Sequence, residues 1–511
     1  MRRSILQVSY IIAPILILAV LSSWSGIPST PLPTTDLTFA VPTSPQPYVT
    51  LLPKVPASSL SPFLIYPTNT TIWVASVSSP GNPAESQLRQ YFIDGTSIGV
   101  LNLTNVIVSS IVADPSNRSS RIWFTENSTL SLYDSTLSEQ TKAISFPGQS
   151  LQYLTNDPQG RIWISMASSS GRSTIAVYDP VSHTNQTYAV PTIGAIIQGI
   201  TVAPGNTIWF AEAGSRKIGR LVPGVSPVFS EFSPPPSISL AAPVQLAVDA
   251  SGNVWFTDHG SNQFGVFDPQ ASTWKAFPIG YCLNNCVSGL PNAIFLDAKN
   301  TIWFSEHVAG RIAHYDPSTG LLTEYSVPGS NAPYTWWAMP GPKNLVWFVA
   351  LALGQIGYVN ASIPVATGLS HAISELTVQR GSFQRVPITV SSASQEKFSL
   401  NSSEVTQDAP PFNPPQIYSS SQSGVVPGEN PYSTNIMIFA AWNATFGQRY
   451  VALTAFDSKV SLSVFVRVNV IDSSISYVAV GSVSMIILGS LIIFVNRRRR
   501  PNAKSVARLR K

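Results

Sequence analysis

The sequence predicts an all-β protein with a seven-bladed β-propeller, an immunoglobulin-like β-sandwich and a C-terminal transmembrane helix, in that order. Three observations predict this. A tryptophan-centred segment recurs seven times, no useful helical period separates the copies, and an uncharged run near the C-terminus is followed at once by four arginines. The expected boundaries are 36–360 for the propeller, 361–475 for the sandwich and 477–495 for the membrane helix.

Each copy of the repeat is a polar turn followed by an aliphatic residue, a tryptophan and an aromatic or aliphatic residue, as in NTIWFSE at 300–306. The copies are spaced 50, 40, 46, 46, 48 and 44 residues apart and place their tryptophans at Trp73, Trp123, Trp163, Trp209, Trp255, Trp303 and Trp347. Each continues through a loop with Gly or Ser to a strand with a Pro motif. Four short strands in about 45 residues predict one propeller blade per copy.

The last blade lacks a final strand of its own, because GQIGYVN at 354–360 is not followed by a suitable segment. The segment DLTFAVPTSPQPY at 36–48 closely matches LLTEYSVPGSNAPY at 321–334, the end of the sixth copy. We therefore expect residues 36–43 to supply the outer strand of the last blade. This pairing of the chain ends would close the ring and leave no open sheet edge there.

Residues 361–475 have a different pattern, in which apolar and polar residues alternate. One face of the last predicted strand is wholly apolar: Val460, Leu462, Val464, Val466, Val468 and Val470. Such alternation is typical of a half-buried strand in a β-sandwich. We interpret the region as a small immunoglobulin-like domain that holds the propeller away from the membrane.

The basic charge of the chain lies at its two ends. Arg2, Arg3 and the segment 497–511 hold ten of the 30 Lys and Arg, which leaves 20 against 25 Asp and Glu in the main body. This mildly acidic body excludes a basic nucleic-acid-binding surface as the dominant feature. Residues 1–29 are a signal peptide or an uncleaved anchor. The four arginines after 477–495 should stay in the cytoplasm. We expect a cell-membrane protein with a large extracellular domain and a basic cytoplasmic tail at 496–511.

The two cysteines, Cys282 and Cys286, lie four residues apart in GYCLNNCVSG. Outside the cell such a pair can close a small disulfide. A metal site would need two more ligands, and the neighbouring sequence offers none, so we favour the disulfide.

The repeat resembles the virginiamycin B (streptogramin B) lyase family over residues of about 36–360. The segments that carry the resemblance are IWFTENSTLSLYD at 122–134, IWFAEAGSRKIGRLVPG at 208–224, VWFTDHGSNQFGVFDP at 254–269 and IWFSEHVAGRIAHYDP at 302–317. The resemblance implies a seven-bladed propeller. It also implies a magnesium-dependent ring-opening elimination, in which the metal polarises an ester and an imidazole takes the adjacent proton.

The residues that the resemblance assigns to this chemistry are missing. The family places a His about eleven residues before the tryptophan of the last blade, a Glu two before that His and another Glu four after the tryptophan. With a two-residue gap in the last blade, the best match for the His is Tyr334, with Ala332 two before it; Leu351 stands four after Trp347, and the substrate-binding His of the preceding blade is matched by Asn292. A Tyr with a pKa of about 10 is a poor base at neutral pH. We expect that the lyase site is not retained, with Tyr334, Glu306 and His307 as weak catalytic candidates.

Amide side chains precede four of the tryptophans by ten or eleven residues: Gln152, Gln198, Gln245 and Asn292. They form either a ligand-binding ring at the mouth of the channel or hydrogen bonds that join neighbouring blades. Tyr334 and Trp336, with Trp337, could stack on a ligand at the channel entrance or belong to the core of the last blade.

Acids stand three residues after four of the tryptophans: Glu126, Glu212, Asp258 and Glu306. With His259 and His307 they could hold a cation if several faced the channel. We favour a structural role, because an acid here belongs to the repeat itself, and because Glu306 and His307, adjacent on a strand, should point to opposite faces.

The predicted function is a surface-anchored module that binds a glycan, a peptide or an envelope protein, and no cofactor is predicted. The alternative is a carbon–oxygen lyase or hydrolase with a rearranged site, for which Mg²⁺ would be the cofactor. A purely structural role in the cell envelope is a third hypothesis.

Overall fold

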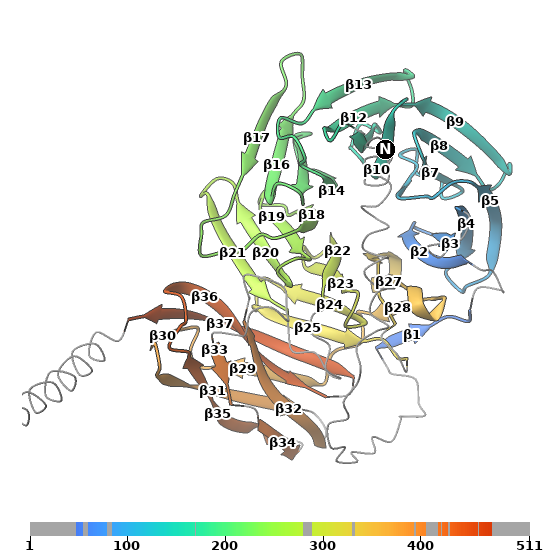
Figure 1. Ribbon diagram of the computed structural model, residues 1–511. Coiled ribbons are helices and arrows are strands. Elements are labelled where there is room, and N and C mark those ends of the chain that lie inside the picture. Colours follow the sequence, from blue (N-terminus) through green and yellow to red (C-terminus); the bar gives the residue numbers. More distant parts are fainter. Residues whose placement is uncertain are drawn as a thin grey trace, which may run out of the picture.

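The computed structural model describes residues 48–54, 60–78, 84–168, 170–279, 289–329, 333–392, 395–404, 417–420, 422–427, 430–457 and 459–472. Within these residues the regular secondary structure consists of strands and two single-turn 3-10 helices, η1 (Pro342–Asn344) and η2 (Leu351–Leu353). Seven sheets surround a central channel, and a two-sheet domain is attached to one of them (Figure 1). The prediction of an all-β fold with a seven-bladed propeller is confirmed.

Each blade is a four-stranded antiparallel sheet, and its strands follow one another from the channel outwards. Blades 1 to 3 comprise β2 (Leu60–Pro67), β3 (Thr71–Ser78), β4 (Glu85–Phe92) and β5 (Ser97–Thr104); β6 (Ile111–Ala113), β7 (Arg121–Glu126), β8 (Thr129–Asp134) and β9 (Glu139–Ser145); and β10 (Gln149–Asn156), β11 (Ile162–Ser168), β12 (Ser173–Asp179) and β13 (Thr184–Ala189).

Blades 4 to 7 repeat this order, and the last borrows a strand. They comprise β14 (Ile197–Val202), β15 (Ile208–Glu212), β16 (Lys217–Val222) and β17 (Val228–Phe232); β18 (Pro243–Val248), β19 (Val254–Asp258), β20 (Gln263–Asp268) and β21 (Thr273–Pro278); β22 (Pro291–Leu296), β23 (Ile302–Glu306), β24 (Arg311–Asp316) and β25 (Leu321–Ser326); and β26 (Ala338–Pro340), β27 (Leu345–Ala350) and β28 (Gln355–Asn360) with β1 (Val49–Leu51).

The repeated tryptophan lies on the second strand of every blade and is buried in all seven copies. In three blades the turn before it fixes its indole. Asp157, Asp249 and Asp297 each accept a hydrogen bond from the indole Nε1 at 2.8–3.2 Å, while their other carboxylate oxygen accepts backbone N–H groups of the turn. One side chain thus shapes the turn and positions the large ring that fills the space between blades.

The ring is closed by an N-terminal strand, but not by the residues that the sequence pattern selected. β1 pairs with β28 in the register Val49 to Val359 and Leu51 to Gly357, so residues 49–51 border the last blade rather than 36–43. The segment 36–43 lies outside the described residues. The likeness of 36–48 to 321–334 correctly indicated that the closing strand comes from the N-terminal part of the chain. It placed the start of that strand at residue 36, whereas β1 begins at Val49.

The second domain consists of two sheets with a common apolar core. One contains β29 (Thr367–His371), β31 (Phe383–Ser392), β35 (Tyr432–Ala440) and β33 (Ile417–Ser419); the other contains β30 (Glu375–Gln379), β37 (Val460–Ile471), β36 (Gly447–Phe456), β32 (Gln395–Glu404) and β34 (Gln422–Pro427). Alternate residues of both sheets, such as Val386 and Ile388 on β31 and Val464 and Val466 on β37, meet in this core. The two sheets therefore form a β-sandwich.

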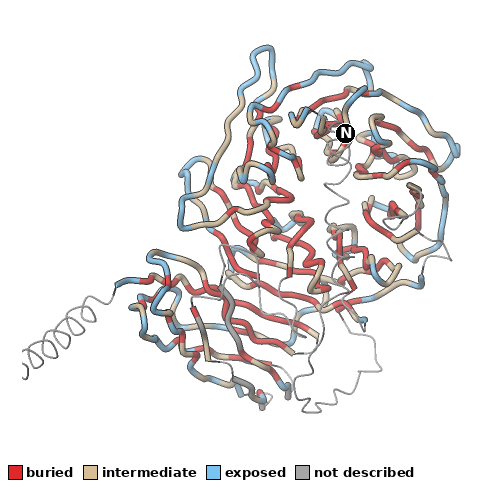
Figure 2. The backbone as a smooth tube through the Cα atoms, viewed as in Figure 1, coloured by how far each residue is buried: buried red, intermediate tan, exposed pale blue. Residues whose placement is uncertain are grey.

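The sandwich is continuous with blade 6, because β25 pairs antiparallel with β37 from Leu321–Val464 to Tyr325–Val460. A single nine-stranded sheet therefore runs from the channel into the sandwich (Figure 1). The expectation that β37 is half-buried is wrong for its first half. Ser461, Ser463 and Phe465 on the second face are also buried, and Phe465 packs against Phe277 of blade 5 at 4.9 Å between ring centroids. Figure 2 shows the buried strands at this junction.

Four predictions concern residues outside the described part of the chain: the N-terminal segment 1–29, the disulfide between Cys282 and Cys286, the membrane helix 477–495 and the tail 496–511. Among the residues that are described, no helix has the length and apolarity required to cross a bilayer.

The closing strand provides a test of the ring. Val49 is 1% exposed and lies in the core formed with Val359, whereas its neighbour Thr50 is exposed. We expect Val49→Ala to lower the free energy of unfolding by about 2 kcal/mol, because it leaves a cavity in a closed sheet. Thr50→Ala should change it by less than about 0.5 kcal/mol. Thermal unfolding followed by circular dichroism compares the two variants, and equal melting temperatures would show that β1 does not close the ring.

Candidate functional site

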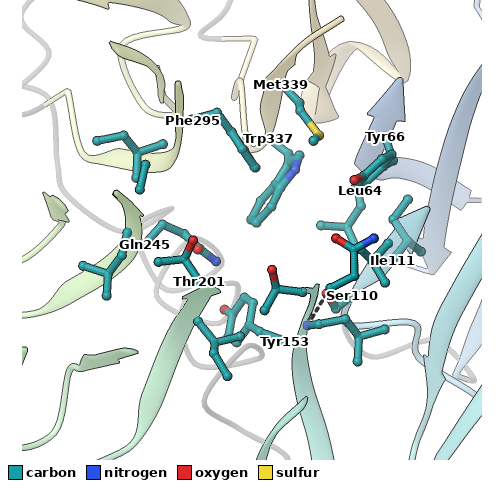
Figure 3. A pocket seen from close by; sticks show the side chains of 18 of the residues that line it. Leu64, Tyr66, Ser110, Ile111, Tyr153, Thr201, Gln245, Phe295, Trp337 and Met339 are labelled. Carbon is teal, nitrogen blue, oxygen red and sulfur yellow. Dashed lines mark hydrogen bonds between the residues drawn. The ribbon is translucent and has the colours of Figure 1, made fainter. Parts of the chain in front are cut away.

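The central channel contains a cavity of about 270 Å³ to which the innermost strand, or the residues beside it, of all seven blades contributes. Its lining is Leu64, Tyr66, Ser110, Ile111, Val112, Tyr153, Leu154, Thr155, Asn156, Ile200, Thr201, Gln245, Leu246, Ala247, Val248, Ile294, Phe295, Leu296, Trp337 and Met339. Figure 3 shows Trp337 and Met339 extending into it from blade 7, opposite Tyr153 and Thr201. A larger hollow of about 570 Å³ lies between the outer parts of blades 2 and 3, and no inner strand lines it.

The lining of the channel cavity is apolar and aromatic with a few uncharged polar groups. None of its residues carries a carboxylate, an imidazole or an amine. Burial raises the pKa of the Tyr153 phenol, and burial likewise raises the pKa of Tyr66 against a hydrogen bond to the backbone of Ala113. Both tyrosines therefore remain protonated at neutral pH. The cavity can hold a ligand by stacking and hydrogen bonding, but its own residues do not supply a base.

The four predicted amides all sit at β-bulges of the inner strands. The ladder with the second strand slips between Leu151 and Tyr153, Ile197 and Gly199, Pro243 and Leu246, and Pro291 and Ile294. Each slip encloses one of the amides: Gln152, Gln198, Gln245 and Asn292. A bulge leaves residues out of the ladder and turns their side chains, so the common spacing of the amides from the tryptophans reflects a conserved backbone feature of the repeat.

Three of these amides join blades. The Gln245 Nε2 donates to the Gln198 backbone carbonyl at 3.3 Å, and the Asn292 Nδ2 donates to the Trp336 carbonyl at 2.7 Å. The Gln198 side chain accepts a hydrogen bond from the Tyr153 hydroxyl at 3.0 Å. Gln152 instead donates to Ser150 on its own strand. Of the four, Gln245 lines the channel cavity, while Gln152 and Gln198 line a smaller cavity of about 70 Å³ between blades 3 and 4.

In blades 3, 5 and 6 a hydroxyl two residues after the tryptophan bonds to backbone groups of its own blade, of the next blade or of both. The Thr257 Oγ1 accepts the Gln245 N–H freed by the bulge at 3.3 Å and donates to the Asn292 carbonyl of blade 6 at 2.5 Å. The Ser305 Oγ donates to the Trp336 carbonyl of blade 7 at 3.2 Å. The Ser165 Oγ accepts the N–H of Tyr153 at 3.2 Å. These hydroxyls are fully buried, so they satisfy backbone groups that water does not reach.

The aromatic segment 334–337 divides its side chains between core and channel. Trp336 is 9% exposed and stacks on Phe63 of blade 1 at 5.3 Å, so it belongs to the core between the last and first blades. Trp337 lines the cavity instead. Tyr334 is half-buried with a positive φ of 49°, an uncommon conformation for a residue with a side chain. Trp337, rather than Trp336, is the aromatic residue that a channel ligand would meet.

The four acids after the tryptophans lie in four separate blades, each within its own network. Glu126 accepts from Ser131 and Gln140 and pairs with Lys142 at 3.1 Å, all inside blade 2. Asp258 accepts the backbone N–H groups of Ala241 and Ala242 at 2.9 and 2.7 Å and so fixes the segment that leads into blade 5. Among the residues that the structure describes, no three His, Cys, Asp or Glu side chains gather as a metal centre would require.

Glu306 is enclosed in a buried charge cluster at the sandwich junction. It is 0% exposed, as is Glu324 on β25, and Arg311 on β24 is 4% exposed. The Arg311 Nη1 lies 3.1 Å from the Glu324 Oε2 and donates to the Ser461 hydroxyl of β37 at 3.3 Å. Burial and the nearby Glu324 carboxylate raise the pKa of Glu306 well above its usual range, although Arg311 opposes this. Arg311 therefore joins blade 6 to the sandwich, and Glu306 is buried beside it in surroundings that favour its neutral form.

β23 ends at Glu306, so strand alternation does not apply to His307, which lies in the following turn in an environment different from that of Glu306. Its ring lies 5.2 Å from Trp336 and 4.7 Å from His259, and its Nδ1 donates to the Leu290 carbonyl at 3.0 Å. Burial, with a smaller contribution from His259, lowers the pKa of His307 to about 3, and burial lowers that of His259 to about 4. Both imidazoles are neutral at pH 7. The ring of Tyr334 lies 6.4 Å from that of His307 between centroids.

Sequence reasoning missed most of the cavity. Tyr66, Tyr153, Asn156, Thr201 and Met339 line it, yet none stands at a position that the repeat marks. A usable signal exists: the inner strand precedes the tryptophan strand in every copy, so alternate residues of that strand should face the channel. The bulges disturb this alternation, and their positions are not visible in the residue pattern.

No protein-family model and no curated protein matches this chain. Among solved structures, a catalytically inactive variant of virginiamycin B lyase from Staphylococcus aureus, solved with quinupristin, is 19% identical with a TM-score of 0.50 over 61% of this chain and 98% of that one. Another structure of virginiamycin B lyase from Staphylococcus aureus is 18% identical (TM-score 0.49, 61% and 98% covered), and a streptogramin B lyase structure is 20% identical (TM-score 0.49, 61% and 97% covered).

The chain is therefore a β-propeller of the virginiamycin B lyase type in its fold. At these identities the likeness concerns the arrangement of the seven blades, and the chemistry of this chain is argued from its own side chains.

The inter-blade hydroxyls can be tested with an isosteric substitution. We expect Thr257→Val to lower the free energy of unfolding by about 1 to 3 kcal/mol, because it leaves the Gln245 N–H and the Asn292 carbonyl without a partner. Thr187→Val on the exposed strand β13 is the control and should be nearly neutral. Equal effects of the two substitutions on the free energy of unfolding in denaturant would show that the hydrogen bonds of Thr257 do not stabilise the propeller.

Glu212 gives a pH-dependent prediction. Burial raises its pKa to about 7, so the folded protein holds a proton that the unfolded chain releases above about pH 4.5. Stability attributed to Glu212 is therefore present at low pH and is lost as the pH rises from about 4.5 to 7. Glu212→Gln cannot ionise and should gain on the order of 2 kcal/mol relative to wild type between pH 5 and 7.5.

The control for this substitution is Glu126→Gln, at the same repeat position of blade 2, where Lys142 pairs with the acid. Melting temperatures of the three proteins at pH 5 and 7.5 provide the measurement. A Glu212→Gln curve parallel to that of wild type would contradict the assignment.

Proposed function

We propose that this protein is a membrane-anchored cell-surface β-propeller whose central channel binds an uncharged ligand. The observation that carries the proposal is the composition of the cavity, in which Trp337, Phe295 and two tyrosines surround neutral hydrogen-bonding groups. Aromatic faces stack on sugar rings, and amides and hydroxyls match the hydroxyl groups of a glycan. Of the candidates considered, a neutral glycan fits this lining best, ahead of a charged peptide or the exposed surface of an envelope protein.

The proposed location is supported by the sequence. An N-terminal signal peptide or anchor at 1–29, the apolar segment 477–495 and the arginine-rich tail at 496–511 favour one topology, with the propeller and the sandwich outside the cell. In this arrangement the sandwich, which we propose to be immunoglobulin-like, stands between the propeller and the bilayer. A disulfide between Cys282 and Cys286 is consistent with that compartment.

The alternative function is a magnesium-dependent carbon–oxygen lyase or a hydrolase with a rearranged site. The observation that favours it is the proximity of His307, His259 and Tyr334 at the side of blades 5 to 7. The chemistry of these groups weighs against it. Both imidazoles are buried with lowered pKa values, and burial raises the pKa of Glu306, the carboxyl next to His307 in sequence. A metal prefers ionised carboxylates, which this group of residues does not offer.

The test is binding by the full-length protein in lipid nanodiscs to arrays of neutral glycans and of envelope proteins. We expect binding to a neutral glycan, and a loss of at least about tenfold in affinity for Trp337→Ala, equivalent to about 1.4 kcal/mol of lost contact. Phe92→Ala removes an aromatic ring that is 48% exposed outside the channel and serves as the matched control.

Absence of binding on both arrays would count against the proposal. The alternative is examined in parallel by incubating the protein with a streptogramin and magnesium and following ring opening by mass spectrometry. Turnover that Tyr334→Phe abolishes would replace the binding function with the lyase function.

A further inference from the structure

Four aromatic side chains are exposed together at the end of the sandwich where β37 ends. Phe383, Phe439, Trp442 and Phe446 are 46, 36, 68 and 51% exposed, and we call this group the aromatic end. Other exposed hydrophobic residues of the described chain, such as Leu137 and Val181, stand in separate turns of the propeller. A gathered aromatic patch on a soluble domain indicates a contact surface.

The aromatic end is built from adjacent elements. Phe383 on β31 and Phe439 on β35 are cross-strand partners with ring centroids 5.2 Å apart. Trp442 and Phe446 belong to the connection 441–446 between β35 and β36. A Cβ added to Gly381 would lie 2.4 Å from the Trp442 ring, so the indole rests directly on the turn that joins β30 to β31.

The same turn connects the patch to the last residue of β37. The Arg380 N–H donates to the Ile471 carbonyl at 3.1 Å, and the Gly381 N–H donates to the Ala440 carbonyl at 2.8 Å. The second half of β37 pairs with β30, beyond the part that pairs with blade 6. In Figure 1 this end lies at the left, away from the propeller.

Two cations flank the aromatic rings. The Arg380 guanidinium lies 3.5 Å from the centre of the Phe446 ring and donates to the Ala444 carbonyl at 2.5 Å. Arg449 donates to the Thr445 carbonyl at 2.6 Å, and Asp472, the residue after β37, is an exposed acid. Aromatic rings with arginines at their edge are typical of segments in the interfacial layer of a bilayer, where the rings enter the headgroups and the cations meet phosphates.

The chain length after β37 identifies the occupant of this surface. Six residue steps separate Ile471 from residue 477, where the predicted membrane segment begins. An extended chain of that length reaches about 20 Å, so an anchored protein keeps the aromatic end within that distance of the hydrocarbon core.

We infer that the aromatic end rests in the headgroup layer of the bilayer, as a second membrane contact beside the C-terminal segment. The inference rests on the membrane anchorage of the proposed function. Two contacts fix the tilt of the sandwich, and the β25–β37 ladder transmits that orientation to the propeller. The channel is thereby presented at a set angle to the cell surface.

The experiment uses the full-length protein in vesicles of phosphatidylcholine and phosphatidylglycerol, with and without brominated phosphatidylcholine. A fluorophore whose emission is quenched by bromine is attached to the cysteine of Asn443→Cys, an exposed position next to Trp442. The protein also carries Cys282→Ser and Cys286→Ser, so that only the introduced cysteine is labelled. Val181→Cys on the propeller, 89% exposed, is the matched control position. Sedimentation with the vesicles after an alkaline wash reports anchorage separately.

We expect quenching at position 443 to exceed that at position 181 several-fold in protein that sediments with the vesicles. The added substitutions Trp442→Ser and Phe446→Ser should reduce quenching at 443 towards the control value without releasing the protein. Equal quenching at both positions in anchored protein overturns the inference and leaves the proposed anchorage intact; it would direct attention to a protein partner or a second copy of the chain. Failure to sediment overturns the anchorage and the inference together.

If the cysteine-free background does not fold, the unlabelled wild-type protein and Trp442→Phe replace it. Trp442, at 68% exposure, is the most exposed tryptophan among the described residues. Trp442→Phe should therefore lower the quenching of intrinsic fluorescence by brominated lipid. No change in that quenching would again contradict the contact.

Discussion

The propeller depends on how buried backbone groups are satisfied at the β-bulges of its inner strands. A bulge leaves backbone groups out of the ladder, and where these groups are buried they need another hydrogen-bond partner. In blades 5 and 6 a hydroxyl two residues after the tryptophan supplies such a partner: Thr257 bonds to its own blade and to the next, and Ser305 bonds to the next. Gly199 shows how closely the blades approach, because a Cβ there would lie 2.4 Å from the Val244 carbonyl. In these blades the buried tryptophan and the hydroxyl two residues later act on the same contact between neighbouring blades.

The uncharged lining of the channel is related to how the blades are joined. Three amides near the start of inner strands, Gln198, Gln245 and Asn292, take part in hydrogen bonds between blades, and the inner strands line a cavity of neutral chemistry. Ionisable groups lie elsewhere: Glu306, Arg311 and Glu324 support the junction with the sandwich, and His307 is buried beside Trp336. This distribution of charge supports the proposed recognition function, because Arg311 and Glu324 form an ion pair at the junction and His307 is buried.

The sequence predicted the fold class, the number of blades and the borrowed closing strand, because tryptophan spacing and turn residues act locally and repeat. It did not locate β1, since the match between 36–48 and 321–334 compares residue types and not hydrogen-bonding register. It could not decide which of the adjacent residues Trp336 and Trp337 faces the channel, because that depends on where the following strand, β26, begins. The burial of Ser461 and Ser463 on β37 depends on a pairing with β25 about 140 residues away, which no local pattern encodes.

The central claim is that the channel of this propeller recognises a neutral ligand. The most direct measurement is an experimental structure of the full-length protein purified from membranes of cells that produce it, at a resolution that shows the contents of the channel. The account predicts an uncharged organic molecule stacked on Trp337, with hydrogen bonds to Gln245 or Thr201. A metal ion held by carboxylates near His307, with an imidazole directed at a bound ester, would contradict it.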